Sequence, residues 1–257
     1  MAQSSIIVCF ALKEEAAPFR KIARAKTATA QASISILLTG IGRQNAEKSL
    51  REFLAGGASV PASRLQDASA GHARLARTLA LPDLVLTCGF AGGLNPDLKL
   101  GDVVFEMANR RDELHESQIK TEVRDSRSSS LREKLIAAGA KPVKFFCADR
   151  IATTVAEKKQ LRAETGADVV EMESAAIHAV CAGQGIPCAT VRVISDTANE
   201  DLPLDFNALS KPDKNLDYGK LFLAIAMSPG KIGALMELQK KTKFAAEQLA
   251  EVLAKLI

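Results

Sequence analysis

Acidic side chains follow three apolar, strand-like stretches of the sequence. Glu15 comes after IIVCFAL, Glu171 and Glu173 stand in VVEMES, and Asp196 ends ATVRVISD. Because ligands of open α/β sheets collect at the carboxyl ends of the strands, acids at three such ends can converge on one site, where they would supply acid–base chemistry. The alternative is local. Glu15 and Asp196 would then favour a helix start or a turn, and Glu173 would cap a helix beginning at Ser174.

Two glycine-rich stretches also follow predicted strands. TGIGRQNA (Thr39–Ala46) opens a predicted helix, and CGFAGGLNPDLKLGDVV (Cys88–Val104) continues from a buried strand. Glycines let a backbone approach a ligand closely, and amides at a helix start attract anionic groups. Tight turns between strand and helix are an equally good interpretation of each stretch alone. A dinucleotide fingerprint needs a third glycine that Gly40-Ile41-Gly42 lacks, so we expect neither a nicotinamide nor a flavin cofactor.

These side chains must be positioned by alternating strands and helices. Short apolar runs predict strands at Ile6–Leu12, Ser33–Thr39, Leu84–Cys88, Asp102–Glu106, Val143–Cys147, Asp168–Val170 and Cys188–Ile194. Many of these runs are apolar throughout, which is typical of strands covered on both faces. Helical patterns occupy Glu14–Arg24, Gln44–Leu54, His72–Leu79, Ser130–Ala138, Ala156–Glu164, Ser174–Gly183 and Lys231–Ile257. The alternation predicts a three-layer α/β domain with a largely parallel sheet between helices.

The length of 257 residues favours a single domain spanning residues 1–257, with two domains as the minority reading. Gly56–Gly71 is rich in small and turn-forming residues, and Arg110–Ser130 is polar with many charges. We expect both stretches to be surface excursions. Neither is long enough to be a convincing linker between domains.

Composition argues against several classes of protein. A net charge of +4, with basic residues scattered among acids and no tryptophan, gives no basis for nucleic-acid binding. No apolar run approaches the roughly 18 residues of a membrane helix, and the N-terminus lacks the pattern of a signal peptide. Five cysteines without a C-x-x-C pair predict neither disulfides nor a zinc site, and no other metal-ligand cluster is evident. We expect a soluble, cytoplasmic protein.

Several motifs occur in one order along most of the chain: ALKEEAAPF, LLTGIGRQNA, TCGFAGGLNPDLKLGDVV, ADRIAT, VVEMESAAIHAVC and VRVISDTA. With them the sequence resembles the purine nucleoside phosphorylase and nucleosidase superfamily, and most closely its 5′-methylthioadenosine/S-adenosylhomocysteine nucleosidases. The resemblance implies a three-layer α/β/α sandwich with a twisted mixed sheet. It also implies a small nucleoside substrate, no cofactor, and assembly as a homodimer or larger homo-oligomer.

The resemblance further implies roles for the acids. Glu15 matches the acid that orients and deprotonates the attacking water, and Asp196 matches the acid that protonates the leaving purine. Glu173 matches the acceptor of hydrogen bonds from the ribose 2′- and 3′-hydroxyls, and Met172 matches a residue packed against sugar and base. We therefore expect Glu173 in a ribose pocket and Glu171 paired elsewhere or solvated.

Other positions match the surroundings of the purine. Ile151 stands where members of the family place an aromatic that stacks on the base, and the backbone of Ala152 matches the contact to the base edge. Ser195 stands beside Asp196, and Arg192 is expected to support that acid from behind.

The nucleophile is water or phosphate. The acid matched to water activation favours water. The position after Gly89, commonly a serine that helps to hold the nucleophile, is Phe90, and Thr87 stands where some phosphorylases keep an arginine. Gly42 and Arg43 form a candidate anion site, so a phosphorylase remains the alternative. A non-catalytic nucleoside-binding protein is a second alternative, which the retained acids disfavour.

The expected substrate is a 5′-substituted adenosine such as methylthioadenosine or S-adenosylhomocysteine. EMANRRDELHESQIK, after the GDVV strand, is polar and looks short for a nucleosidase. An open 5′ side would suit a bulky substituent, as in the adenosylhopane nucleosidases, whose GFAGGL motif is similar. His115 in that stretch is a 5′ contact or a surface histidine. Asp201–Asn207 is a lid or a structural loop fixed by Pro203.

Overall fold

The computed structural model of the chain describes residues 4–27, 32–56, 65–66, 81–107, 121–209, 230 and 232–256. The predicted helix His72–Leu79, His115 and most of the predicted loop Gly56–Gly71 lie outside these residues.

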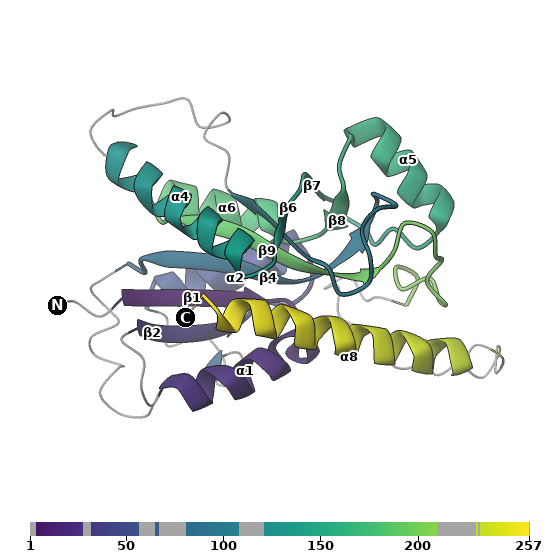
Figure 1. The fold of residues 1–257 in the computed structure, drawn as a ribbon, viewed down its shortest axis with the longest axis horizontal. Helices are drawn as coiled ribbons and strands as arrows, with labels where there is room; N and C mark the ends of the chain where they lie inside the picture. Colours follow the sequence, from purple (N-terminus) through teal and green to yellow (C-terminus); the bar gives the residue numbers. More distant parts are fainter. Residues whose placement is uncertain are drawn as a thin grey trace.

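Nine strands in the described part of the chain form one sheet (Figure 1). They are β1 (Ser4–Phe10), β2 (Ala32–Leu38), β3 (Leu65–Gln66), β4 (Leu84–Gly93), β5 (Val103–Met107), β6 (Lys141–Pro142), β7 (Phe145–Cys147), β8 (Val169–Glu171) and β9 (Cys188–Asp196). The main path runs β3-β2-β1-β4-β9-β5-β6, and β8 pairs with β4 and β7. The central strands β2, β1, β4 and β9 are mutually parallel, whereas β5 is antiparallel to β9 and β8 to β4. The carboxyl ends of the four central strands therefore meet at one edge.

Alternate side chains of the strands enter two hydrophobic cores, one on each face of the sheet. In β1, Val8 and Phe10 belong to one cluster of buried apolar residues, and Ile7 and Cys9 belong to the other. Successive side chains of a strand point to opposite faces, so a strand buried on both faces must be apolar at every position. This explains why the central strands read as continuous apolar runs.

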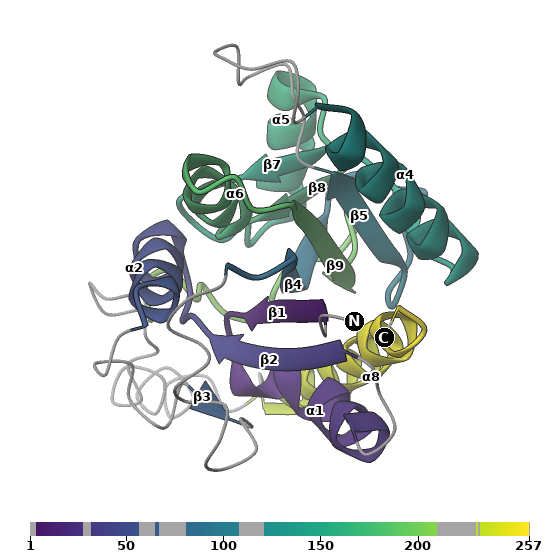
Figure 2. The same ribbon diagram turned by 90° about the vertical axis from the view of Figure 1, so that its left-hand side faces the viewer.

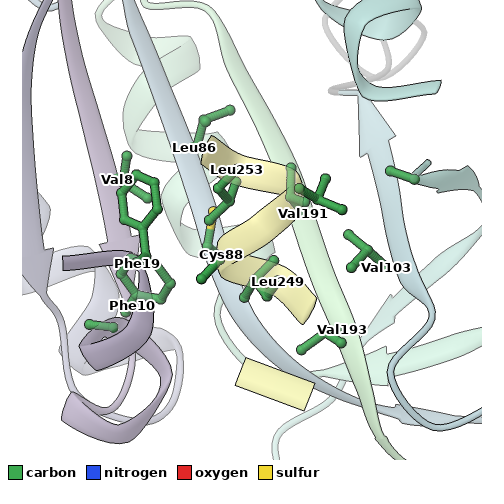
Figure 3. Close-up of a cluster of buried hydrophobic side chains, with 14 of the residues drawn as sticks. Val8, Phe10, Phe19, Leu86, Cys88, Val103, Val191, Val193, Leu249 and Leu253 are labelled. Atoms are coloured by element: carbon green, nitrogen blue, oxygen red, sulfur yellow. The ribbon is translucent and has the colours of Figure 1, made fainter. Parts of the chain in front are cut away.

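Helices cover both faces of the sheet (Figure 2). They are α1 (Lys13–Thr27), α2 (Arg43–Leu54), α4 (Thr121–Ala137), α5 (Val155–Thr165), α6 (Ser174–Gly183) and α8 (Ile232–Ala254). α1 and α8 pack on the face that contains Val8, and Figure 3 shows Phe19 of α1 and Leu249 of α8 in that core. α2 and α6 cover the opposite face. The predicted three-layer α/β/α sandwich is confirmed. No helix in the described ranges is long and apolar enough to cross a membrane.

Two predicted boundaries are wrong. β4 continues to Gly93, so the glycines of GFAGG lie in a strand and not in a turn. The strand continues because β9 pairs with it as far as Asp196, with a register shift after Ala91, while β8 pairs with Gly92 and Gly93. The second error concerns the polar stretch Arg110–Ser130, which is helical from Thr121. A helix with few apolar residues in its first turns lacks the periodicity that sequence patterns detect.

Candidate active site

A cavity of about 260 Å³ opens where the central strands end. Its volume lies just below the usual range of roughly 300–1,000 Å³ for ligand sites. The lining is mostly apolar but contains the acids that the sequence singles out from three distant segments, Glu15, Glu173 and Asp196. The other lining residues are Ala11, Leu12, Ile41, Phe90, Ala91, Gly92, Arg150, Ile151, Ala152, Val170, Glu171, Met172, Ser195, Leu202, Phe206, Leu238 and Thr242.

Glu15 stands in the first turn of α1, directly after β1, and only 3% of the residue is exposed. Its two carboxylate oxygens accept hydrogen bonds from the backbone N–H groups of Leu12 and Phe90, each at 2.8 Å. Burial raises the pKa of Glu15 to about 7, although Arg192 and the two N–H groups act in the opposite direction. A carboxyl group with such a pKa is suited to accept a proton at neutral pH.

Arg192 of β9 lies among buried carboxylates. Its Nη2 atom is 2.5 Å from Glu171 Oε2 and 3.2 Å from Glu173 Oε2. Glu171 also accepts hydrogen bonds from the backbone N–H of Ser174 at 2.9 Å and from its hydroxyl at 2.6 Å. Burial acts to raise the pKa of Glu171, but Arg192, the hydroxyl of Ser174 and the backbone N–H of Glu173 lower it overall. Glu171 is thus a buried ion-pair partner and is not solvated.

Glu173 precedes α6, yet its side chain makes no hydrogen bond that caps this helix. Glu173 Oε1 instead accepts a 2.8 Å hydrogen bond from the N–H of Gly42, in the glycine turn after β2. Burial raises the pKa of Glu173; Arg192 opposes this effect and the carboxylate of Glu171 adds to it. The helix-cap interpretation of Glu173 is therefore wrong, and the side chain faces the cavity.

Asp196 ends β9 and pairs in register with Gly92 of β4. Its Oδ1 atom accepts a 2.7 Å hydrogen bond from the hydroxyl of Ser195, and its Oδ2 atom lies 2.6 Å from Lys158 Nζ. Sequence reasoning missed Lys158. It stands in VAEKKQLRAET, a charged stretch of α5, where a lysine is usually exposed, and yet its side chain is 0% exposed.

The segment Asp201–Asn207 is hydrogen-bonded to Ile151 and Thr153 beside the cavity. The side-chain amide of Asn207 accepts a hydrogen bond from the N–H of Ile151 and donates one to its carbonyl, each at 2.9 Å. The N–H of Leu202 donates to the carbonyl of Thr153 at 2.8 Å. These bonds favour the interpretation as a structural loop over that as a lid.

In the described ranges, the backbone groups of the next residue, Ala152, are not hydrogen-bonded in this way. Ala152 is buried and lines the cavity, but within the described ranges its backbone N–H and C=O have no hydrogen-bond partner. Buried backbone groups are nearly always paired, so this peptide edge is available to a ligand.

Comparison with known proteins gives the family. The model of the phosphorylase superfamily matches residues 10–216. The chain belongs to this superfamily.

Relatives of this superfamily member include named nucleosidases. It is 30% identical over 155 residues to a 5′-methylthioadenosine/S-adenosylhomocysteine nucleosidase of Shewanella halifaxensis, across 52% of this chain and 67% of the relative. It is 30% identical over 146 residues to an aminodeoxyfutalosine nucleosidase of Campylobacter jejuni, across 48% of this chain and 60% of the relative. The matched region thus spans about two thirds of the first relative and less of the second.

Solved structures show that the fold is shared. Futalosine hydrolase of Helicobacter pylori superposes with a TM-score of 0.60 at 18% identity, over 99% of this chain and 97% of the other. A 5′-methylthioadenosine/S-adenosylhomocysteine nucleosidase of Neisseria meningitidis, in complex with methylthio-immucillin-A, gives 0.59 at 18% identity, over 98% of both chains. The superfamily and the fold inferred from the sequence motifs are both confirmed.

The expected position of Arg192 in this phosphorylase-superfamily chain is wrong. Its guanidinium bonds to Glu171 and Glu173 and not to Asp196. In a strand, the Cα atoms of residues four apart are separated by about 13 Å. Arg192 is therefore far along β9 from Asp196 and contacts instead the acids at and just after the end of β8.

The candidate anion site at Gly42 and Arg43 is not supported. The N–H of Gly42 already donates to Glu173. The guanidinium of Arg43 lies 3.4 Å from Asp149 Oδ1 and donates to the carbonyl of Cys147. Both groups therefore hold protein atoms and not a ligand.

Gly89 precedes Phe90, which lines the cavity, and its φ of +149° favours glycine. A Cβ atom there would lie 2.5 Å from Arg192 Nη1 and 2.7 Å from Glu15 Oε1. We predict that Gly89→Ala displaces Glu15 and lowers kcat/KM by on the order of 10²-fold. Initial rates of base release test this, with Gly183→Ala as control because a Cβ atom at Gly183 meets nothing within 4 Å. Wild-type kcat/KM in Gly89→Ala would contradict the prediction.

Proposed function

We propose that the protein is a purine nucleosidase that hydrolyses the N-glycosidic bond of a 5′-substituted adenosine, such as methylthioadenosine or S-adenosylhomocysteine. One observation carries the proposal. Glu15, Glu173 and Asp196 come from three distant segments and line one cavity of this superfamily fold. Cleavage of the bond needs a base for water, a carboxylate near the sugar and an acid for the base, and these side chains supply all three.

Asp196 and Ala152 support binding of the purine. The peptide edge of Ala152, which has no partner among the described residues, offers a donor and an acceptor at one side of the cavity. Ile151 and Phe206 line the cavity and provide apolar surface for a flat ring. We propose that Ala152 binds the edge of the base and that Asp196 faces its five-membered ring.

Glu173 and Met172 are proposed to bind the ribose. Glu173 uses lone pairs of its two oxygens for Gly42 and Arg192, and a carboxylate offers about four acceptor sites in all. The remaining sites can accept hydrogen bonds from two hydroxyl groups. The buried carboxylate also stabilises the positive charge that develops on the sugar ring as the bond breaks.

The reaction then balances as a hydrolysis. The bond between C1′ and the purine nitrogen breaks, its electron pair stays with the base, and Asp196 passes a proton to the base. Water attacks C1′, and Glu15 takes a proton from this water. The products are free purine and a sugar with a hydroxyl group at C1′.

Water is favoured over phosphate as the nucleophile. A phosphorylase must hold an anion, which requires free cations and donors. Among the cavity-lining residues that the structure describes, Arg150 is the only lysine or arginine, and it pairs with Glu157. Arg192 is 1% exposed and committed to carboxylates. Glu15, in contrast, is suited to neutral water.

The test is release of base from a nucleoside panel in phosphate-free buffer and with added phosphate. The panel contains methylthioadenosine, S-adenosylhomocysteine, aminodeoxyfutalosine and adenosine, and chromatography detects free adenine and the sugar product. We expect release without phosphate and a product that is not phosphorylated. Release only with phosphate would identify a phosphorylase, and binding without release would identify a nucleoside-binding protein.

The pH dependence offers a separate prediction. Glu15 must be ionised to accept the proton of water, and burial raises its pKa from 4.5 to about 7. We therefore expect kcat/KM to rise with pH and to reach half of its plateau near pH 7, because the protonated form below that pH is inactive. Rates from pH 5 to 9 in buffers of constant ionic strength test this. An acidic limb near pH 4.5 would contradict the assignment of Glu15.

We also propose that the protein works in the cytoplasm as a homo-oligomer. All five cysteines are free thiols, which supports a reducing compartment. Light scattering coupled to size-exclusion chromatography tests the oligomeric state, and a monomeric mass would contradict it.

A further inference from the structure

Lys158 is a buried cation in direct contact with the proposed acid. Its ammonium donates to the carbonyls of Thr197 at 2.7 Å and Glu200 at 2.9 Å, and it lies 2.6 Å from Asp196 Oδ2. An ammonium has three N–H donors, so these three acceptors use all of them. Lys158 has no donor left for a ligand and acts on the cavity only through Asp196.

The nearby carboxylate of Glu200 is paired with another lysine, so Asp196 is the counter-ion of Lys158. A buried cation requires a charge partner. The carboxylate of Glu200 lies 2.5 Å from Lys241 Nζ of α8 and accepts a 2.7 Å hydrogen bond from the N–H of Thr197. Burial acts to raise the pKa of Glu200, but these bonds lower it overall, so Glu200 stays ionised beside Lys241. Within the described ranges, Asp196 alone forms a salt bridge with Lys158.

We propose that Lys158 is a positioning residue that presents Asp196 to the base as an ionised hydrogen-bond acceptor. The pocket is then complementary to a purine that carries a hydrogen on N7, and less so to the purine of the intact substrate. The inference rests on the proposed function, which supplies the purine ligand.

The chemistry of the two partners gives the reason. A carboxylate only accepts hydrogen bonds, and Lys158 and Ser195 already occupy one site on each oxygen of Asp196. The facing edge of a substrate adenine offers one donor, the 6-amino group, and one acceptor, N7. Once N7 has taken a proton, that edge offers two donors. Asp196 therefore binds the departing base better than the substrate, which is the condition for catalysis.

The proton balance is closed. The proton that N7 receives enters from solvent and passes through Asp196 as the bond to C1′ breaks. Glu15 takes one proton from the attacking water and returns it to solvent. No proton is gained or lost over a full cycle.

Two isosteric ligands test the proposal on the wild-type protein. 9-Methyladenine has a bare N7 acceptor, and 9-deaza-9-methyladenine carries a hydrogen on N7. We expect the second ligand to bind about 10- to 100-fold more tightly at pH 7.5, because a hydrogen bond to a charged group replaces a repulsion.

Variants then assign the effect to Lys158. Lys158→Met should reduce the ratio at pH 7.5 to about threefold or less, because the 2.6 Å contact that holds the Asp196 carboxylate as an acceptor is then lost. Lys159→Met, at the exposed neighbouring position, should keep the wild-type ratio. Thermal unfolding checks that both variants fold, and Lys158→Gln, which also lacks the charge, replaces Lys158→Met if that variant does not fold.

A wild-type ratio near one or an unchanged ratio in Lys158→Met would overturn the proposal. Base release by the wild-type protein separates this outcome from failure of the proposed function. If bases are released but the ratio is near one, only the role of Lys158 fails. If the ratio holds but no nucleoside is cleaved, the proposed function fails and the role of Lys158 stands.

Discussion

Replacement of Asp196 by asparagine is expected to lower kcat by about 10²–10⁴-fold. Asparagine preserves the size of the side chain and its hydrogen bond to Ser195, but it cannot pass a proton to the departing base. The base must then leave with an unneutralised electron pair, which raises the barrier. Initial rates of adenine release at saturating substrate measure the effect. Near-normal turnover would remove Asp196 from the mechanism.

Stability must be separated from chemistry in this experiment. Asp196→Asn leaves Lys158 buried without its charge partner, so we expect a lower melting temperature as well. The double variant Lys158→Met with Asp196→Asn removes both charges and should recover much of that stability while turnover stays low. Asp97→Asn, an exposed aspartate in the turn after β4, should match the wild type in both measurements.

Replacement of Glu15 by glutamine is expected to cost a similar factor in kcat, about 10²–10⁴-fold. The amide cannot take a proton from water. Its NH₂ group must also face the N–H of Leu12 or Phe90, where the carboxylate has an acceptor. KM should change little, because the contacts to base and ribose remain.

The chain provides a close control for this substitution. Glu14 is the preceding residue in α1 and is exposed. Glu14→Gln should therefore keep wild-type kcat and the acidic limb near pH 7, which Glu15→Gln should lose. A Glu15→Gln variant with more than about a tenth of wild-type kcat would contradict the role of general base.

The sequence predicted those parts of the fold that depend on local pattern. The strand of Val8 and Phe10 is apolar on both faces, so its burial and its type could be inferred without a structure. The meeting of Glu15 and Asp196 could also be predicted, because acids at the ends of parallel strands share one edge. Glu173 reaches the same cavity from just after β8, which is antiparallel to β4, so this rule does not account for its position.

Features that depend on tertiary partners could not be predicted. Lys158 is buried because α5 packs its side chain against the turn after β9, which no helical periodicity encodes. Arg192 pairs with Glu171 because β8 and β9 both pair with β4, which brings the end of β8 close to Arg192. The strand β4 extends through its glycines because two neighbouring strands continue to pair with it.

The two hydrogen bonds between Asn207 and Ile151 have a consequence for inhibitor chemistry. Both backbone groups of Ile151 are already hydrogen-bonded to the loop, so this wall of the cavity is preassembled. A flat heterocycle that binds against it loses little free energy in ordering the wall. Leu238 and Thr242 add surface to the cavity from α8, which these two hydrogen bonds do not restrain. A medicinal chemist would therefore hold the heterocycle constant and search for selectivity among substituents that reach this helix.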